Sequence, residues 1–153
     1  YLYGEGRKII DQYTTSTICM YKIINLEEIN HKYCRELGNK VIEKTSEYIK
    51  QNISTQYVYV RYMGPKFVIA FSGVELNGVA EFINELKEKL ENTIISLNET
   101  NDEEEENKKM EVCPKLNFTL STYYKGTGLE EVLKKQEEYL DNCDANESNI
   151  TNI

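Results

Sequence analysis

The sequence lacks the segments that would place it in or across a membrane. No stretch of about 18 consecutive apolar residues occurs in its 153 residues, so it predicts no transmembrane helix and no membrane contact by this segment. No charged segment followed by an apolar one opens the chain, which excludes a recognisable signal peptide and favours a cytoplasmic location. The first residue is Tyr1 rather than methionine, so we expect a piece of a longer parent protein, and that parent can still carry a membrane anchor.

Metal-binding and disulfide patterns are absent as well. The chain has a single histidine, His31, and none of its four cysteines forms a C-x-x-C pair. A zinc site needs closely spaced cysteine and histidine ligands, so none is predicted. Cysteines this sparse do not make a disulfide framework, and we expect all of them to be reduced, small apolar residues of a cytosolic domain. They are Cys19, Cys34, Cys113 and Cys143.

Positive charge is also in short supply. Lysine and arginine number 18 against 26 acidic residues, a net charge of −8, which excludes binding to nucleic acid or an anionic membrane by bulk charge. Residues 99–111 hold seven of the acids against two lysines, so this short stretch alone contributes a net −5. Apolar periodicity is lost over residues 93–114, and we predict an acidic, flexible insertion there.

What is present is a clear alternation of apolar patterns. Gly38 interrupts the first helical pattern, so that segment is predicted to be a short helix or turn followed by a longer helix. Only residues 63–65 separate the second and third strand patterns, which predicts a tight antiparallel hairpin. The predicted strands are 16–24, 55–62, 66–72 and 115–124, and the predicted helices are 26–50, 77–91 and 128–140.

This order of elements predicts an α+β fold, an α/β sandwich with a ferredoxin-like or palm β-α-β-β-α-β core and an extra C-terminal helix. Right-handed crossovers place the first strand beside the central hairpin, and we expect the two helices of this core to pack on one face of the sheet. The core is predicted to span residues 16–144. Residues 1–15 are then an N-terminal flank and residues 145–153 a C-terminal tail.

Four segments, in chain order, resemble the motifs of GGDEF domains, the diguanylate cyclases. Residues 61–67 (RYMGPKF), followed by VIAF, resemble the R-Y-G-G-D/E-E-F hairpin, and residues 29–42 (INHKYCRELGNKVI) resemble I-N-D-x-Y-G-H-x-x-G-D-x-x-L. Residues 117–121 (NFTLS) are similar to the family's v-T-x-S-I-G strand, and residues 128–140 to its last helix. The resemblance covers roughly residues 16–144 and implies the fold predicted above.

The resemblance also implies a chemistry that this chain is not equipped to perform. GGDEF enzymes condense two GTP molecules into cyclic di-GMP, and carboxylates on the first strand and in the hairpin hold the magnesium ions. The matching positions here are Lys22, Pro65 and Lys66. A lysine ammonium repels Mg²⁺ instead of ligating it. We therefore predict no catalytic residue, no cofactor, no magnesium at the usual site and no cyclase activity by the family's mechanism.

Five residues are predicted to bind a nucleotide: Lys22, Asn30, Asn39, Gly64 and Lys66. By the resemblance, the two asparagines occupy the positions that contact the guanine edge, and an asparagine in the second position can also tolerate adenine. The lysines can face a phosphate in place of a metal, and the glycine lets a backbone approach it closely. The alternatives are solvated lysines, asparagines that cap helices or turns, and an ordinary hairpin turn.

Two further departures from the family are visible. The R-x-x-D site at which the family binds its inhibitory product corresponds to residues 54–57 (STQY), so feedback by cyclic di-GMP at that site is not predicted. The phosphate-contacting lysine of the family's last helix falls near Asp144 in an acidic or neutral stretch.

We therefore predict a degenerate, catalytically inactive GGDEF-like domain, a nucleotide-sensing or protein-interaction module of a larger bacterial cyclic di-GMP signalling protein. Its expected partners are GTP, ATP or another nucleotide and other domains of the parent chain; a homodimer is compatible with the resemblance. The alternative is an enzyme, an atypical diguanylate cyclase or weak nucleotide hydrolase whose metal ligands are other acids such as Glu27, Glu28 and Glu36. A third interpretation is a partner-binding domain without a ligand.

Overall fold

A computed structural model describes residues 1–98, 109–143 and 146–153 of the chain. Each predicted strand and helix is present, and most ends shift by no more than a few residues. The strands are β1 (Thr15–Ile23), β2 (Val58–Met63), β3 (Lys66–Ser72), β4 (Ile95–Asn98), β5 (Lys109–Val112), β6 (Leu116–Tyr124) and β7 (Ile150–Asn152). The helices are the π-helical turn η1 (Leu2–Gly6), α1 (Arg7–Ile10), α2 (Leu26–Lys32), α3 (Arg35–Asn52), α4 (Leu76–Glu91) and α5 (Leu129–Asn142).

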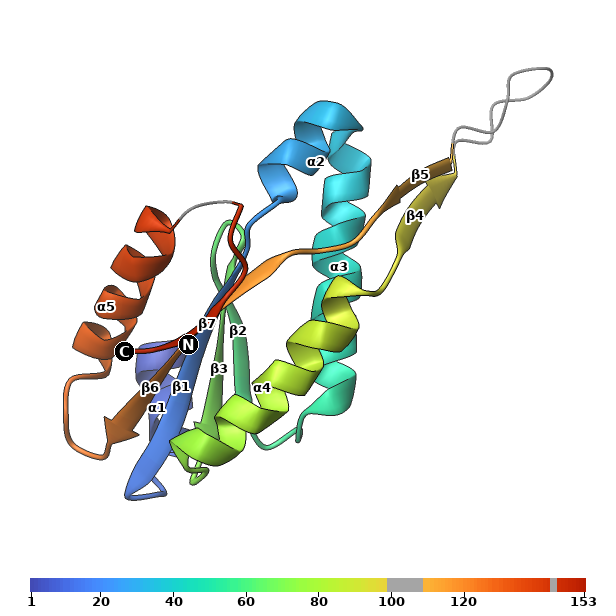
Figure 1. Cartoon of the computed structure of the whole chain (residues 1–153). Coiled ribbons are helices and arrows are strands. Elements are labelled where there is room, and N and C mark those ends of the chain that lie inside the picture. Colours follow the sequence, from blue (N-terminus) through green and yellow to red (C-terminus); the bar gives the residue numbers. More distant parts are fainter. Residues whose placement is uncertain (99–108, 144–145) are drawn as a thin grey trace, which may run out of the picture.

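The main sheet has the strand order β2-β3-β1-β6-β7 (Figure 1). Strand β1 is central and antiparallel to both neighbours, and β7 lies parallel to β6. The prediction that the first strand lies beside the β2–β3 hairpin is confirmed. A central strand is hydrogen-bonded along both edges and covered on both faces, which is why β1 is buried along nearly its whole length and has an apolar run at residues 18–21.

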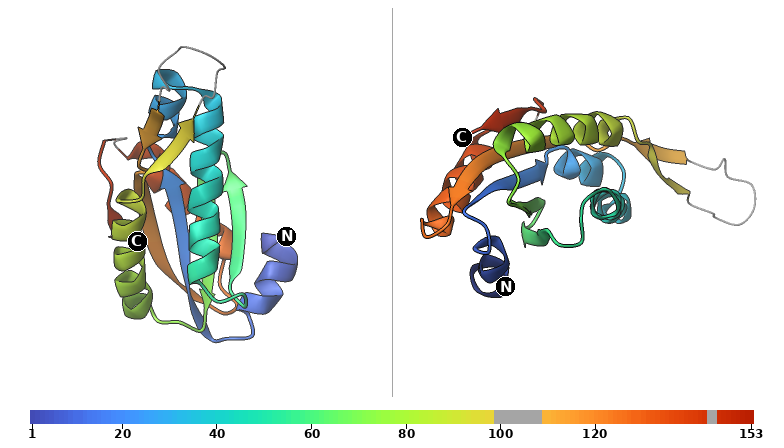
Figure 2. Two further views of the ribbon diagram at one scale, coloured as in Figure 1. Left: turned by 90° about the vertical axis from the view of Figure 1, so that its right-hand side faces the viewer. Right: turned by 90° about the horizontal axis from the view of Figure 1, so that it is seen from below.

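The main helices of the predicted core, α3 and α4, pack on one face of the sheet, which confirms the prediction, and the additional helices α1 and α5 cover the other face (Figures 1 and 2). On one face, Tyr21 and Ile23 of β1 pack in a core formed mainly with α3 and α4. On the other face, Ile18 and Met20 pack in a core with α1 and α5. Because successive side chains of a strand point to opposite faces, an apolar run such as β1 needs a cover on each side.

The first helical segment is divided, as predicted, but the division does not lie at the glycine. The chain leaves α2 at Tyr33 and Cys34, and Cys34 is extended with φ −165°. Gly38 lies buried inside the first turns of α3. A Cβ atom at this position would come within 1.8 Å of Asn30 Oδ1, so the glycine leaves room for the Asn30 side chain of α2 to lie against α3.

Both predicted flanks belong to the folded core, which corrects the limits 16–144. Leu2 and Ile10 are buried in the cluster under α5, because this face of the sheet needs apolar cover that α5 alone does not supply. At the other end, β7 adds a strand to the sheet, with Ile150 paired to Phe118. These segments lack the length or periodicity that would have identified them as elements.

The ends of the predicted insertion 93–114 are ordered. Strands β4 and β5 pair with each other as a two-stranded antiparallel ribbon, which we call the arm, and it projects from the body of the domain (Figure 1). The acidic run 102–106 lies outside the described residues. All four cysteines are free. Within the described ranges, no helix combines the length and apolar composition needed to cross a membrane.

Candidate functional site

The predicted nucleotide-binding residues lie at one end of the main sheet, where β1 ends and the β2–β3 hairpin turns. Lys22 and Lys66 are direct cross-strand partners on β1 and β3, and both belong to the face that α5 covers. The turn residues Gly64 and Pro65 follow β2, and the chain leaving β1 leads directly into α2 with Asn30. Residues predicted separately from the hairpin and from the first strand are therefore neighbours in the structure.

Lys66 is tied to the last helix. It is buried, with 7% of its surface exposed, and its ammonium donates a hydrogen bond to Asp141 Oδ1 at 2.8 Å. Glu137, one turn earlier on α5, lies 3.8 Å from the same ammonium. The lysine at the position of a family acid thus has two carboxylate partners of its own, because a buried ammonium needs compensating charge.

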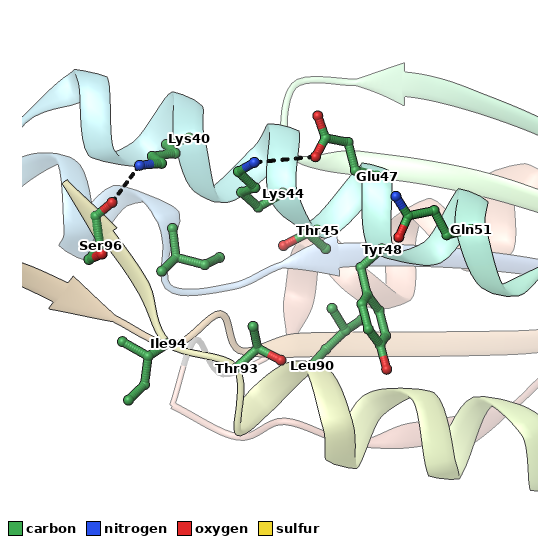
Figure 3. Close-up of a pocket in the computed structure, with 11 residues that line it drawn as sticks. Lys40, Lys44, Thr45, Glu47, Tyr48, Gln51, Leu90, Thr93, Ile94 and Ser96 are labelled. Atoms are coloured by element: carbon green, nitrogen blue, oxygen red, sulfur yellow. Dashed lines mark hydrogen bonds and ion pairs between the residues drawn. The ribbon is translucent and has the colours of Figure 1, made fainter.

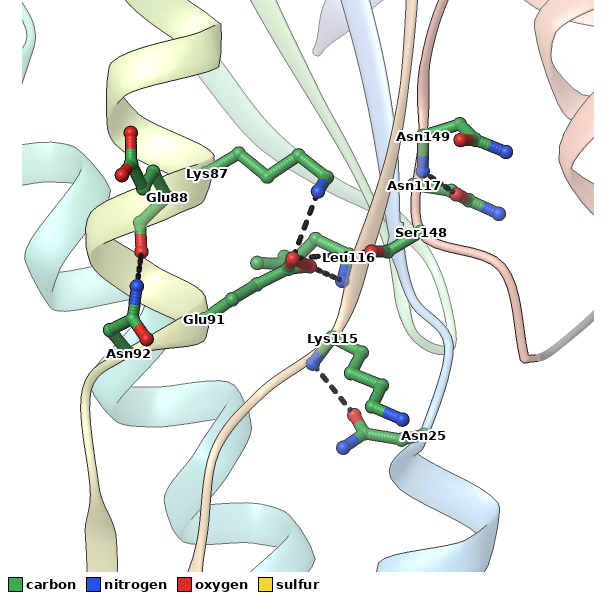
Figure 4. Close-up of polar contacts among 10 residues, drawn as sticks. All are labelled: Asn25, Lys87, Glu88, Glu91, Asn92, Lys115, Leu116, Asn117, Ser148 and Asn149. Atoms are coloured by element: carbon green, nitrogen blue, oxygen red, sulfur yellow. Dashed lines mark hydrogen bonds and ion pairs between the residues drawn. The ribbon is translucent and has the colours of Figure 1, made fainter.

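Lys22 lies beside this ion pair but makes no ion pair within the part of the chain that the structure describes. On its other side it is the cross-strand partner of Asn117. The Asn117 oxygen accepts a hydrogen bond from the Asn149 backbone N–H at 2.6 Å, and its buried amide nitrogen has no partner (Figure 4). A half-buried lysine and a residue with an unsatisfied donor therefore lie opposite each other on neighbouring strands.

Two tyrosines, Tyr62 and Tyr3, lie close to Glu137, one of the two carboxylate partners of Lys66. Tyr62 of β2 lies near Tyr3 of η1 and Glu137 of α5. Burial raises the pKa of Tyr62 to about 12, and the charge of Glu137 and the interactions with both neighbours act in the same direction. The hairpin, the N-terminal turn and the last helix are thus joined by polar contacts around Lys66.

The hairpin turn is braced by its own strands. Gly64 has φ +56°, a left-handed conformation that favours glycine, and its carbonyl accepts a hydrogen bond from Arg61 Nε at 2.9 Å. The Pro65 carbonyl accepts the Ile23 N–H at 3.1 Å, which fixes the turn against the end of β1. The turn is a two-residue connection between Met63 and Lys66, so its glycine is already accounted for by hairpin geometry.

The two predicted base-reading asparagines lie on the opposite side of the β1 end, on α2 and α3. Asn30 lies against Gly38, and Asn39 follows directly along α3; both are exposed. No side-chain cap hydrogen bond is made at the start of either helix, so neither asparagine is a helix cap. The structure places Asn30 against Gly38, the residue before Asn39, and leaves both asparagines exposed.

Several residues that support this end of the sheet were not predicted from the sequence. Asn25, between β1 and α2, donates to the Cys113 carbonyl at 2.9 Å. Its oxygen accepts the Lys115 N–H at 3.0 Å (Figure 4). Glu91 of α4 accepts hydrogen bonds from Lys87, from Ser148 and from the Leu116 N–H. Asp141 and Glu137 were missed too. Their partners are distant in sequence, and only an acidic residue near a predicted helix end could have hinted at them.

The residues at this site do not fit a magnesium ion. The family's carboxylate positions supply two ammonium groups and a proline, and the nearby carboxylates of α5 are engaged by Lys66. Glu27, Glu28 and Glu36, the alternative ligands, are exposed on α2 and α3. Among the described residues, no three acidic, cysteine or histidine side chains are grouped closely enough to hold a metal ion.

Comparison with solved structures identifies the same architecture in GGDEF domains. The GGDEF domain of DgcB from Caulobacter crescentus, solved with c-di-GMP, is similar with a TM-score of 0.78 at 15% identity, over 95% of this chain and 81% of that one. The diguanylate cyclase SiaD from Pseudomonas aeruginosa, solved with its activator SiaC, is similar with a TM-score of 0.78 at 8% identity, over 99% and 57%. The FimX GGDEF domain from Pseudomonas aeruginosa gives 0.70 at 11% identity, over 96% and 85%.

At these identities the structural likeness establishes the fold. A search of curated protein sequences finds no match. The family described as "Diguanylate cyclase, GGDEF domain" matches residues 6–149, which is nearly the whole chain; strand β7 lies just beyond the end of the match. The chain therefore belongs to the GGDEF domain family.

Proposed function

We propose that this domain does not make cyclic di-GMP and acts instead as a nucleotide-sensing or protein-interaction module of a larger signalling protein. The observation that carries the proposal is the Lys66–Asp141 ion pair, at 2.8 Å, in the place where the family holds its metal. Two-metal phosphoryl transfer depends on divalent cations that neutralise the triphosphate and activate the attacking hydroxyl. A site with ammonium groups in place of carboxylates opposes the binding of those cations.

The geometry of α5 adds to this argument. In the resemblance, the last helix supplies a lysine to the phosphates, whereas here it supplies Asp141 and Glu137 to Lys66. The charges of the hairpin and of the last helix are thus both reversed relative to the family. A triphosphate placed at this position would meet the two carboxylates of α5 as well as Lys22.

A sensing role is supported by the asparagines. Asn30 and Asn39 are exposed, so the two proposed base-reading residues are accessible, whereas Lys66 is buried in its ion pair. The bound c-di-GMP of DgcB and the bound SiaC of SiaD are consistent with nucleotides and proteins as ligands of such a fold. For this chain we propose GTP or ATP, other domains of the parent chain or a second copy of the domain as partners.

The test is a nucleotide assay on the purified domain. We expect no cyclic di-GMP and no hydrolysis product, detected by liquid chromatography, from GTP or ATP with Mg²⁺. We expect titration calorimetry with the same nucleotides to give binding that does not require Mg²⁺. Asn30→Ala should weaken that binding, whereas Asn84→Ala, at an exposed position of α4, should not.

One result would contradict the proposal, and another would exclude the sensing role within it. Turnover that depends on Mg²⁺ and is lost in Glu27→Gln or Glu28→Gln would establish the alternative, an atypical enzyme with other metal ligands. Absence of binding by all nucleotides, including cyclic di-GMP, would remove the sensing role and leave a protein-interaction module.

A further inference from the structure

A concave site lies away from the hairpin, where the arm joins the body of the domain. It is a pocket of about 330 Å³ between α3, the C-terminal end of α4 and the first residues of β4 (Figure 3). Its volume is at the lower end of the range for small-molecule sites in proteins. The wall between α3 and the arm is held in place, because the Lys40 ammonium donates to the Ser96 carbonyl at 2.6 Å.

The α3 side of the pocket is polar and incompletely satisfied. Thr45 is 1% exposed and lines the pocket, yet its hydroxyl has no hydrogen-bond partner among the residues that the structure describes. Figure 3 shows Thr45 on the pocket side of α3, next to Lys44 and across from Leu90 and Thr93. A buried hydroxyl without a partner destabilises the free protein, because it has lost its hydrogen bonds to water. This hydroxyl is a donor available to a ligand.

The pocket also carries a cation that is loosely held. Lys44 has one ion-pair partner, Glu47, at 3.5 Å, and both side chains are about half exposed. Such a pair contributes little, so a better-placed anion can replace it. With Lys40, Lys44 and Glu47, the lining carries a net charge of +1 in a chain of net −8. The pocket is thus a local positive site on an acidic protein.

The opposite side of the pocket is apolar. Leu90, Ile94 and Ile95 line it from the end of α4 and the start of the arm. Ile94 is 63% exposed, one of the few large apolar side chains left in water. Covering such a side chain with an apolar ligand is favourable. A polar wall with a loosely paired lysine and an apolar wall with an exposed isoleucine favour a ligand that has one anionic end and one apolar end.

We propose that this pocket binds a small monocarboxylic acid with a short apolar chain. The carboxylate accepts from the Lys44 ammonium and the Thr45 hydroxyl, and the chain lies on Ile94 and the neighbouring apolar wall. A single negative charge fits best, because Glu47 beside Lys44 repels a dianion such as a phosphate monoester. The site is independent of the nucleotide site at the hairpin.

Amide chemical shifts of the ¹⁵N-labelled chain test the proposal, with hexanoate as the probe. We expect hexanoate to shift the amides of residues 44–48 and 93–96 in a saturable manner. Hexan-1-ol, acetate and inorganic phosphate test the charge, the chain and the choice of anion, and each should bind at least about tenfold more weakly. Saturable shifts that are equally strong with acetate or phosphate would overturn the proposal, as would no saturable shift with hexanoate or shifts centred elsewhere.

Two variants localise the ligand. Lys44→Gln should weaken hexanoate binding about tenfold, because it removes a charge-assisted hydrogen bond. Thr45→Val should also weaken it while leaving the thermal midpoint of the free protein unchanged or raised, because the unsatisfied hydroxyl disappears. Lys134→Gln, at an exposed position of α5, is the matched control and should bind hexanoate as the original chain does. Unchanged affinity in Lys44→Gln would refute the site.

Discussion

Restoring an acid at position 66 should destabilise this domain without restoring a metal site. Lys66→Glu returns the type of side chain that the family carries there. In this chain, however, the new carboxylate would face Asp141 and Glu137, which now hold the lysine at 2.8 and 3.8 Å. The side chain at position 66 is only 9% exposed, so the new charge cannot turn fully into water.

The size of the effect follows from the geometry. Two unit charges about 4 Å apart interact by about 4 kcal/mol at the effective dielectric of a protein surface. Reversing one charge turns that attraction into repulsion. Asp141 and Glu137 are 48% and 31% exposed, so both can turn toward solvent and the full change is not realised. We expect Lys66→Glu to lower the free energy of unfolding by about 3 kcal/mol.

The assay is urea unfolding of each variant, followed by circular dichroism. The charge-swapped double variant Lys66→Glu/Asp141→Lys should recover about 1 kcal/mol or more, because it rebuilds the pair with the signs exchanged. Lys66→Met should change the stability by no more than about 1 kcal/mol, since it removes the buried charge and leaves the acids solvated. Lys8→Glu is the matched control, because Lys8 and Glu5 pair at 3.2 Å but are 74% and 69% exposed.

The reasoning would be refuted if Lys66→Glu were as stable as the original chain, or if the double variant recovered nothing. Either result would mean that the hairpin and α5 are not coupled through Lys66. A large loss in Lys8→Glu would show instead that the protein responds to net charge and not to this ion pair. That control should change by less than about 0.5 kcal/mol.

Three further predictions concern other contacts. The fold favours the neutral phenol of Tyr62, so its contribution to the free energy of unfolding is fully present below about pH 10 and is lost as the pH rises toward 12. Tyr62→Phe should reduce this loss in unfolding curves recorded at alkaline pH. Asn25→Ala should lower the urea-unfolding free energy by about 2 kcal/mol, because it leaves the Cys113 carbonyl and the Lys115 N–H without their partner; no loss would show that water replaces the amide. Gly38→Ala should change the free energy of unfolding by less than about 1 kcal/mol, because the higher helix propensity of alanine offsets the clash of its Cβ with the end of the Asn30 side chain. The same variant should abolish any nucleotide binding that depends on Asn30, as measured by titration calorimetry.

The sequence predicted which residues belong to the candidate site, but it did not predict which side chains contact one another there. The two-residue turn after Met63 and the lysines at positions 22 and 66 follow from spacing and resemblance. Their direct pairing depends on the register of β1 and β3, which the apolar pattern and the tight turn specify together. The partner of Lys66 was out of reach, because Asp141 is 75 residues away and a surface acid on a helix looks the same whether it is paired or solvated.

The layer arrangement illustrates the same limit. The helical pattern of residues 128–140 predicted α5, yet a pattern does not say which face of a sheet a helix covers. The segments 1–15 and 145–153 were too short and irregular to be identified as parts of the core. Only the tertiary structure shows that α5 leaves part of this face uncovered and that Leu2 and Ile10 pack there.

The sequence by itself determined the local elements and their order, because periods of two and of three to four residues depend on side chains close together in the chain. Four weak motifs in that order were enough to indicate the family. The tertiary structure decided which charges meet, which face α5 covers, and where an unsatisfied hydroxyl and a loosely paired lysine line the same pocket. These features arise from contacts between residues far apart in the chain, where the energy of an ion pair or hydrogen bond depends on distance and burial and not on residue type alone.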